Sequence, residues 1–275
     1  MNLDQLEDSQ LIDGEWYVQF NTATNGDGRL HANQFTAPEG KKFVGWNTEA
    51  DGSGITYTDQ AVFRMISTGA GYIGSHTAVE LIAAGYDAVI IDNLSNSEAE
   101  AVEGVRRITG VDVPFEQVDT CDEAALRRVF EKYDFGSVIH FAAYKAVGES
   151  VAEPLKYYRN NLASFMNVCA LMKEFGRPNI LFSSSATVYG EPDTLPVTEQ
   201  TPRKPATSPY GNTKQMAEDI LHDCCAAYEG LHGIALRYFN PIGAHPSALI
   251  GELPRGVPQN LVPYITQTAA GLREC

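Results

Sequence analysis

A glycine-rich loop after an apolar segment is the feature that most constrains this chain of 275 residues. The loop, Gly69-Ala70-Gly71-Tyr72-Ile73-Gly74, follows a candidate strand at 62–66 and opens a candidate helix. Glycines let the backbone approach a pyrophosphate, and a helix N-terminus stabilises its negative charge. Asp92 stands 21 residues after Gly71, at the end of a second apolar segment. Because a carboxylate there accepts hydrogen bonds from a ribose and repels a 2′-phosphate, the pattern predicts an NAD site.

The residues from about 61 onward alternate between short apolar segments and helical patterns. Near-continuous apolar segments are typical of parallel strands that are covered on both faces. Such segments lie at 88–91, 137–141, 179–182 and 233–238, with helical patterns at 77–84, 123–133 and 161–175. This alternation predicts an α/β fold with a doubly wound parallel sheet of the Rossmann type over 61–275.

Residues 1–60 have a different composition, rich in glycine, asparagine, threonine and aromatic residues, and predict a small β-rich module. Strands are expected at 16–20 and 42–46, and turn signals occur at 25–28 and 51–54. The stretch around 25–30 also resembles a calcium loop, but Ala23 and Gln34 stand where its first and last ligands should be. A hairpin turn is therefore the better interpretation, and no metal site is predicted.

A tyrosine and a lysine four residues apart suggest where acid–base chemistry takes place. On a helix, Tyr210 and Lys214 share one face. An ammonium beside a phenol is expected to lower the phenol's pKa toward the working range, and Ser185 could share the substrate's proton. The simpler interpretation is an exposed lysine beside a half-buried tyrosine. It is less attractive because the glycine loop predicts a bound NAD, which would accept a hydride. Ser185, Tyr210 and Lys214 are therefore the predicted catalytic residues.

The net charge limits the kinds of partner that this chain can bind, and the cysteines indicate its cellular compartment. A formal net charge of −15 and a pI near 4.7 argue against nucleic-acid and anionic-membrane partners. The odd set of cysteines fits no disulfide framework or metal spacing: Cys121, Cys169, Cys224, Cys225 and Cys275. No apolar run approaches the length of a membrane span, and the first residues lack a signal-peptide pattern. A cytoplasmic protein is expected.

Several segments of residues 66–275 together resemble the UDP-glucose 4-epimerases of the extended short-chain dehydrogenase/reductase family. The matching segments lie at 71–77, 92–97, 140–150, 183–190, 208–211, 237–241 and 259–264. The resemblance implies bound NAD, a UDP-sugar partner, and interconversion of UDP-glucose and UDP-galactose through a 4-keto intermediate. It also allows for a homodimer.

The resemblance implies roles for individual residues. Ser185 and Tyr210 would act at the sugar 4-hydroxyl, and Lys214 would tune Tyr210 and hold the nicotinamide ribose. The residues implied to contact NAD are Gly71, Tyr72, Ile73, Gly74, Asp92, Asn93, Asn96, Asp119, Lys145, Asn160, Ser183, Tyr210, Lys214 and Tyr238. Those implied to contact the UDP-sugar are Ser185, Tyr210, Asn240, Asn260 and Leu261.

A second resemblance concerns the N-terminal module. Residues 34–63, and more weakly those from about 15, are similar to the internalin B-repeat (Listeria–Bacteroides repeat) family. Its phenylalanine–glycine–tryptophan core corresponds to Phe43, Gly45 and Trp46. That family is a β-grasp-like module of bacterial surface proteins, and it implies an adhesive or spacer role without chemistry.

Three departures from the epimerase pattern leave other functions open. Thr68 replaces a glycine of the loop, where a positive φ would strain a β-branched residue. Arg64 interrupts the first strand, and the chain reaches Cys275 before the family's usual end, so the substrate domain is expected to be incomplete. The alternatives are a weak or inactive NAD-binding fragment, a surface-interaction protein, and another nucleotide-sugar-modifying enzyme. A dehydratase is disfavoured because Ala186-Thr187 supplies no carboxylate next to Ser185.

Overall fold

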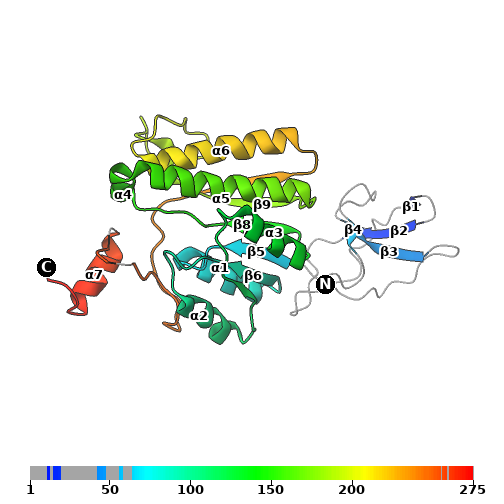
Figure 1. Ribbon diagram of the computed structural model, residues 1–275, viewed down its shortest axis with the longest axis horizontal. Coiled ribbons are helices and arrows are strands. Elements are labelled where there is room, and N and C mark those ends of the chain that lie inside the picture. Colours follow the sequence, from blue (N-terminus) through cyan, green and yellow to red (C-terminus); the bar gives the residue numbers. More distant parts are fainter. Residues whose placement is uncertain are drawn as a thin grey trace. The chain divides into compact units, whose positions relative to one another are not determined.

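The computed structural model describes residues 64–254, 256–258 and 260–274, together with the backbone of four short strands before residue 64. The chain divides into two compact units, one comprising Met1–Arg64 with Leu81–Asp87 and the other Met65–Glu80 with Ala88–Cys275. Figure 1 shows both, coloured along the sequence.

The first unit contains a four-stranded sheet in the order β1-β2-β3-β4. Its strands are β1 (Leu11–Ile12), β2 (Glu15–Gln19), β3 (Lys42–Asn47) and β4 (Thr56–Tyr57). The outer pairs are antiparallel and the central β2–β3 pair is parallel. The two predicted strands at 16–20 and 42–46 are confirmed within a residue at each end. The predicted turns at 25–28 and 51–54, and the stretch weighed as a calcium loop, lie outside the described residues.

The second sheet has six strands in the order β10-β9-β8-β5-β6-β7. They are β5 (Arg64–Thr68), β6 (Asp87–Ile91), β7 (Phe115–Glu116), β8 (Ser137–His140), β9 (Asn179–Ser185) and β10 (His232–Tyr238). The pairs β5–β8, β8–β9, β9–β10 and β6–β7 are parallel. From β5 the chain adds β6 and β7 on one side of that strand. It then crosses back and adds β8, β9 and β10 on the other side of β5. This doubly wound order confirms the predicted fold class.

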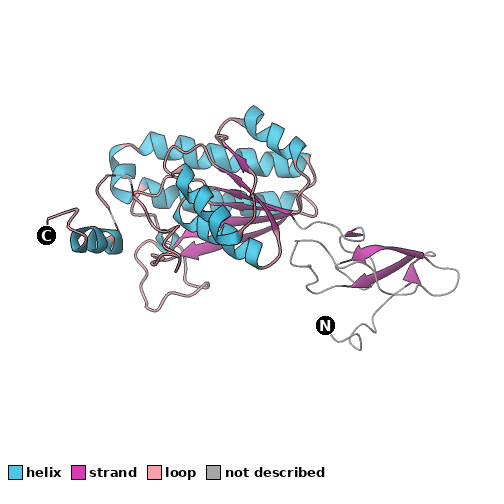
Figure 2. Cartoon of the chain, turned by 90° about the horizontal axis from the view of Figure 1, so that it is seen from below, coloured by secondary structure: helices cyan, strands magenta, loops and turns pink. Residues whose placement is uncertain are grey.

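Helices cover both faces of this sheet (Figures 1 and 2). The helices are α1 (Tyr72–Ala83), α2 (Ala99–Thr109), α3 (Glu123–Lys132), α4 (Val147–Ala152), α5 (Pro154–Glu174), α6 (Pro209–Ala227) and α7 (Leu261–Ala269). Helices α5 and α6 lie side by side on one face, and α1 and α2 lie on the other (Figure 1). Two predicted helices begin earlier than expected, α1 directly after Gly71 and α5 at Pro154. A proline suits the first helical turn because that turn has no N–H partner to lose.

The predicted burial of the apolar strands is confirmed for the central strands of the second sheet and is wrong for β10. Ile66, Val89 and Val138 in the central strands are fully buried, as continuous apolar strands require. The same pattern on β10 predicted burial, but Ile234 is 60% exposed and Leu236 is 37% exposed. The prediction fails for β10 because this strand is the edge of the sheet and α6 covers only one of its faces.

Arg64, which interrupts the apolar pattern of β5, is accommodated by an ion pair at the start of the neighbouring strand. Its Nε lies 2.7 Å from Asp87 Oδ2, and its Nη2 lies 2.5 Å from the same oxygen. Both side chains are only partly exposed. The arginine therefore occupies a strand end where its charge is paired, and not the apolar interior that the pattern assigned to it.

Candidate active site

The carboxyl ends of β5 and β8 mark the place where a doubly wound sheet binds its ligand. These two strands are neighbours, and the connections leave them in opposite directions. Such a switch point opens a crevice between the two loops that follow. The glycine loop follows β5, and Phe141 to Lys145 follow β8. Both predicted cofactor segments therefore reach this one edge of the sheet.

The glycine loop is built tightly on one side and open on the other. Gly69 has a φ of +110°, a conformation that favours glycine, and a Cβ on Gly74 would lie 1.8 Å from the Gly69 carbonyl oxygen. A Cβ on Gly71 would meet nothing within 4 Å. The close turn thus depends on Gly69 and Gly74, while Gly71 faces open space at the start of α1.

Thr68 does not carry the strain that its replacement of a glycine suggested. It is the last residue of β5, and its backbone is extended like the rest of the strand. The expected positive φ is wrong at this position; it falls on Gly69 instead. The Thr68 hydroxyl is buried and hydrogen-bonded to His140 Nδ1 at 2.8 Å. Burial, and secondarily the charge of Lys214, lowers the pKa of His140 to about 3.

Asp92 lies directly after β6 and is tied to the glycine loop. Its Oδ2 accepts from the Ala70 N–H at 2.6 Å, and its Oδ1 accepts from Leu94 N–H and Ser97 Oγ at 2.6 and 2.7 Å. A carboxylate offers about four lone-pair sites, so these three donors leave capacity on Oδ2. The position and the free acceptor suit a ribose hydroxyl beside the loop.

Ser185, Tyr210 and Lys214 come together from the end of β9 and the first two turns of α6. Ser208 begins the helix by accepting from the Gly211 N–H at 3.1 Å, and Pro209 occupies its first position. The Ser185 side chain lies close enough to the Tyr210 phenol to lower its pKa. Lys214 is 4% exposed, and its Nζ donates to the Ser183 carbonyl oxygen at 2.6 Å.

The pKa values in this cluster differ from the simplest expectation. Burial raises the pKa of Tyr210, and the interaction with Ser185 only partly offsets this effect. The prediction that Lys214 brings the pKa of Tyr210 down is wrong for this structure. The Lys214 Nζ lies 5.9 Å from the centre of the Tyr210 ring and 4.8 Å from that of Phe182. Burial in turn lowers the pKa of Lys214 to about 7.

The remaining predicted cofactor residues are divided between loops, helices and a strand: Asn93, Asn96 and Asp119 lie in loops, Ile73 in α1, Asn160 in α5 and Tyr238 in β10. Asn93 accepts from the Ser95 N–H in the turn after Asp92, and Asp119 accepts from the Cys121 N–H. Asn160 donates to Asn161, which holds both backbone groups of Tyr144. Ile73 lies in the first turn of α1, Asn96 is exposed, and Tyr238 ends β10 with its pKa raised by burial.

Glu252, which the sequence did not single out, joins three of the predicted residues. Its Oε1 lies 3.0 Å from Lys145 Nζ and accepts from Asn260 Nδ2 at 2.6 Å. Burial and the charge of Glu252 raise the pKa of Tyr72. The structure therefore places the glycine loop, the loop after β8 and the segment before α7 around one carboxylate.

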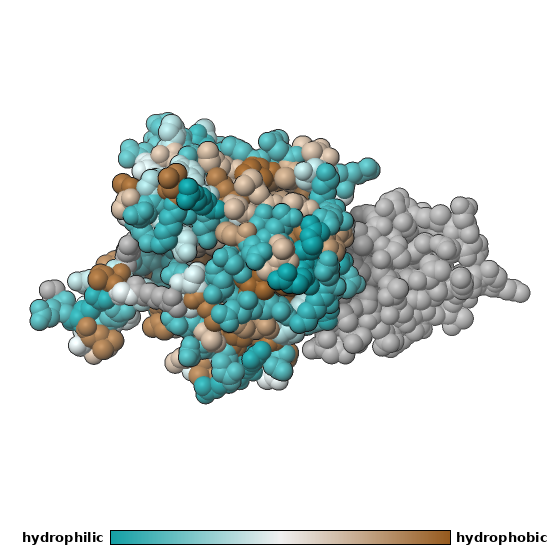
Figure 3. Space-filling model, viewed as in Figure 1, coloured by the Kyte–Doolittle hydropathy of each residue, from teal (hydrophilic) through white to brown (hydrophobic). Residues whose placement is uncertain are grey.

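Two predicted substrate residues lie on the surface. Asn240 is exposed after β10, and Leu261 is 72% exposed at the start of α7. Ile265 and Leu272 are exposed near it, and Figure 3 shows hydrophobic atoms on the α7 part of the surface. Neither Asn240 nor Leu261 is gathered with the Ser185–Tyr210–Lys214 cluster by any contact of the described residues.

Sequence reasoning also passed over the Thr187 hydroxyl. Its Oγ1 is buried without a hydrogen-bond partner among the described residues, and its N–H donates to Ser185 Oγ at 3.2 Å. An unsatisfied buried hydroxyl beside a predicted catalytic serine is available to a ligand. From the sequence, Thr187 served only to disfavour a dehydratase, because it is not a carboxylate. Its hydroxyl was not considered as a ligand-binding group.

Membrane spans and metal clusters are both absent from the described residues. No helix in that part of the chain combines the length and the apolar character needed to cross a bilayer. The same residues contain no group of three histidine, cysteine or acidic side chains arranged to hold a metal ion.

A doubly wound sheet with a glycine loop at its switch point defines the class of dinucleotide-binding α/β proteins. Within that class, the chain belongs to the NAD dependent epimerase/dehydratase family, whose model matches residues 65–270.

Individual relatives narrow the similarity further. The chain is 56% identical over 209 residues to a UDP-glucose 4-epimerase of Dictyostelium discoideum, and 54% identical over 210 residues to one of Bacillus subtilis. These matches cover 76% of this chain but only 60% and 62% of the relatives. A crystal structure of UDP-glucose 4-epimerase from Bifidobacterium longum in complex with NAD+ and UDP is 48% identical, with a TM-score of 0.75. That match covers 77% of this chain and 63% of the other.

Proposed function

We propose that this chain binds NAD and interconverts UDP-glucose and UDP-galactose through a 4-keto intermediate. The observation that carries the proposal is the Ser185–Tyr210–Lys214 cluster at the same sheet edge as the glycine loop. The similarity to UDP-glucose 4-epimerases supports the proposal. The similar Bifidobacterium structure, which is a complex with NAD+ and UDP, supports it as well. Because the chain spans about three fifths of these relatives, activity of the chain itself is part of the proposal.

The residues present fit a dinucleotide. The open space at Gly71 would receive the pyrophosphate at the N-terminus of α1, and the acceptor left on Asp92 would bind the adenosine ribose. Lys214 and Lys145 would face the nicotinamide side. The other residues proposed to contact NAD are Asn93, Asn96 and Asp119 in loops, Asn160 in α5, Ser183 in β9 and Tyr238 in β10. NAD, when bound, supplies the hydride acceptor for carbon 4 of the sugar.

The chain's own residues would handle the proton at the 4-hydroxyl. Tyr210 accepts this proton through its phenolate, and Ser185, which interacts with the Tyr210 phenol, would connect it to the sugar oxygen. Lys214 would hold the nicotinamide ribose by donating hydrogen bonds to its hydroxyls, and it contributes most in its charged form. Its pKa of about 7 makes that form sensitive to pH in the physiological range. Tyr210 would return the proton to the 4-oxygen as the hydride taken up by the cofactor returns to carbon 4 on the other face, which restores the 4-hydroxyl and completes the reaction.

Other features of the proposal rest on the resemblance, on the cysteines and on the change in composition near residue 60. We infer a cytoplasmic protein with a UDP-sugar partner, a homodimer, and a division into a β-rich module at 1–60 and an NAD-binding domain at 61–275. A weak or inactive NAD-binding fragment is the second candidate, because Asn240 and Leu261 are exposed and not gathered at the cluster.

The direct test uses the purified full chain and UDP-galactose. We expect UDP-glucose to form, detected by a coupled dehydrogenase assay, and NAD to be released when the protein is denatured. Bound NAD without turnover would favour the inactive fragment. Absence of both would contradict the proposed function.

Asp92 offers a test of the cofactor site that is independent of turnover. We expect Asp92→Asn to weaken NAD binding by about 10- to 100-fold, because a hydrogen bond to a charged acceptor contributes about 1.5–3 kcal/mol. The ratio of NAD affinity to NADP affinity should decrease at the same time, because the carboxylate that repels a 2′-phosphate is lost. Isothermal titration with each dinucleotide measures both effects. Asp112→Asn, at an exposed position paired with Arg106, is the control and should bind like the parent.

A further inference from the structure

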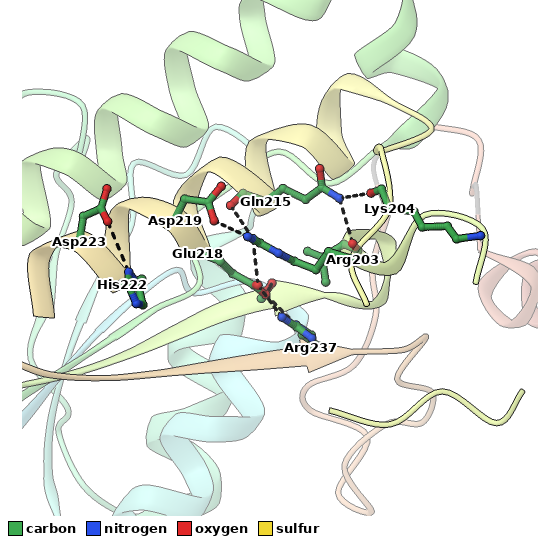
Figure 4. A network of polar contacts seen from close by, with 10 residues as sticks. Arg203, Lys204, Gln215, Glu218, Asp219, His222, Asp223 and Arg237 are labelled. Carbon is green, nitrogen blue, oxygen red and sulfur yellow. Dashed lines mark hydrogen bonds and ion pairs between the residues drawn. The ribbon is translucent and has the colours of Figure 1, made fainter. Parts of the chain in front are cut away.

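Glu218 on α6 is a nearly buried carboxylate that the proposed mechanism does not use. Its side chain is 8% exposed, and Arg237 on β10 clamps both of its oxygens (Figure 4). Arg237 Nε donates to Oε1 at 2.9 Å and Nη2 donates to Oε2 at 2.8 Å. A bidentate arginine fixes both the position and the plane of a carboxylate.

Further contacts hold the clamp in place. Arg203 Nη1 lies 3.6 Å from Glu218 Oε2, and its Nη2 pairs with Asp219 (Figure 4). The Arg237 guanidinium also lies 4.8 Å from the centre of the Tyr189 ring. Glu218 is therefore held by β10 on one side and by the segment before α6 on the other.

The same carboxylate is linked to the catalytic cluster in two ways, through Ser184 and through its place on α6. Ser184 Oγ donates to Glu218 Oε1 at 2.5 Å, and Ser184 lies between Ser183 and Ser185 on β9. Glu218 also stands one helical turn after Lys214, on the same face of α6. Ser183 in turn accepts from the Lys214 Nζ through its carbonyl.

We propose that Glu218 is a positioning residue: clamped by Arg237, it fixes the β9 serine run through Ser184 and keeps the ammonium of Lys214 charged. The role in turnover rests on the proposed epimerase function. The placement of the charge and its effect on Lys214 do not.

The groups around Lys214 decide the direction of this effect. Glu218 and Tyr210 face it from α6, His140 from β8, and the Ser183 carbonyl from β9. Burial lowers the pKa of Lys214, whereas Glu218 raises it. His140 is neutral near pH 7 and adds no opposing charge. Removing the negative charge of Glu218 therefore moves Lys214 toward its neutral form.

The test is Glu218→Gln in the full chain, with Asp223→Asn on the exposed side of the same helix as control. Side-chain NMR of the lysine Nζ, assigned by comparison with Lys214→Met, reports the pKa of Lys214 without requiring turnover. We expect this pKa to fall by about one pH unit in Glu218→Gln and to stay unchanged in Asp223→Asn. If the chain turns over UDP-galactose, the alkaline limb of its pH–rate profile should move to lower pH by a similar amount.

Two further variants separate the contacts. Ser184→Ala removes the serine contact and keeps the carboxylate, so turnover should fall with the pKa of Lys214 unchanged. If Glu218→Gln does not fold because Arg237 is left unpaired, the double variant with Arg237→Met removes the unpaired charge. An unchanged Lys214 pKa in Glu218→Gln or the double variant would overturn the proposal. A shifted pKa in a chain without turnover would support it and contradict only the proposed function.

Discussion

Tyr210→Phe should abolish nearly all turnover of UDP-galactose while leaving NAD bound. The substitution removes the hydroxyl that exchanges the proton with the sugar and keeps the ring in its half-buried position. Because a positioned acid–base group contributes about 10²–10⁴-fold to a rate, we expect kcat to fall within that range. Initial rates over a range of substrate concentrations measure the effect, and NAD released on denaturation shows whether the cofactor site is intact.

Tyr158→Phe provides the matched control. Tyr158 on α5 accepts a hydrogen bond from Asn212 of α6 at 2.8 Å, so this variant also removes a phenol hydroxyl that contacts α6. It leaves the Ser185–Tyr210–Lys214 cluster untouched, and we expect parental turnover. Equal kcat values for Tyr210→Phe and the parent would remove Tyr210 from the proposed proton transfer.

Much of the site could be predicted because its signals are local in the sequence. The glycine loop, Asp92, and the Tyr210–Lys214 pair each need only a short stretch with a known periodicity. Placing them at one sheet edge requires only that parallel strands carry their carboxyl ends to the same side. The same reasoning identified the alternating strands and helices of the second unit.

The parts that were missed depend on tertiary contacts. Glu252 and Lys145 are 107 residues apart in the sequence, and no local sequence pattern predicts a contact between residues so far apart. The pKa of Tyr210 was predicted in the wrong direction because burial, which the sequence does not give, raises it more than the interaction with Ser185 lowers it. Glu218 could have been noticed, since it stands four residues after Lys214, but its clamp by Arg237 could not.

Gly74→Ala should be among the most damaging single substitutions in the glycine loop. The added Cβ would lie 1.8 Å from the Gly69 carbonyl oxygen, which is backbone and cannot rotate away. Either the loop or the start of α1 must move, and such overpacking costs about 1–3 kcal/mol or more. We expect a lower free energy of unfolding in urea and complete loss of NAD binding. Gly148→Ala, with nothing within 4 Å of its added Cβ, should unfold like the parent.

Gly71→Ala separates the two uses of glycine in this loop. Its Cβ would also meet nothing within 4 Å, so the free energy of unfolding should change by less than about 0.5 kcal/mol. If the pyrophosphate occupies the open space at Gly71, the methyl group obstructs it, and we expect NAD affinity to fall by about tenfold or more. Urea denaturation and calorimetric titration of the same preparation measure both quantities. A stable Gly71→Ala protein with parental NAD affinity would exclude this place for the pyrophosphate, because a methyl group cannot share space with a bound phosphate.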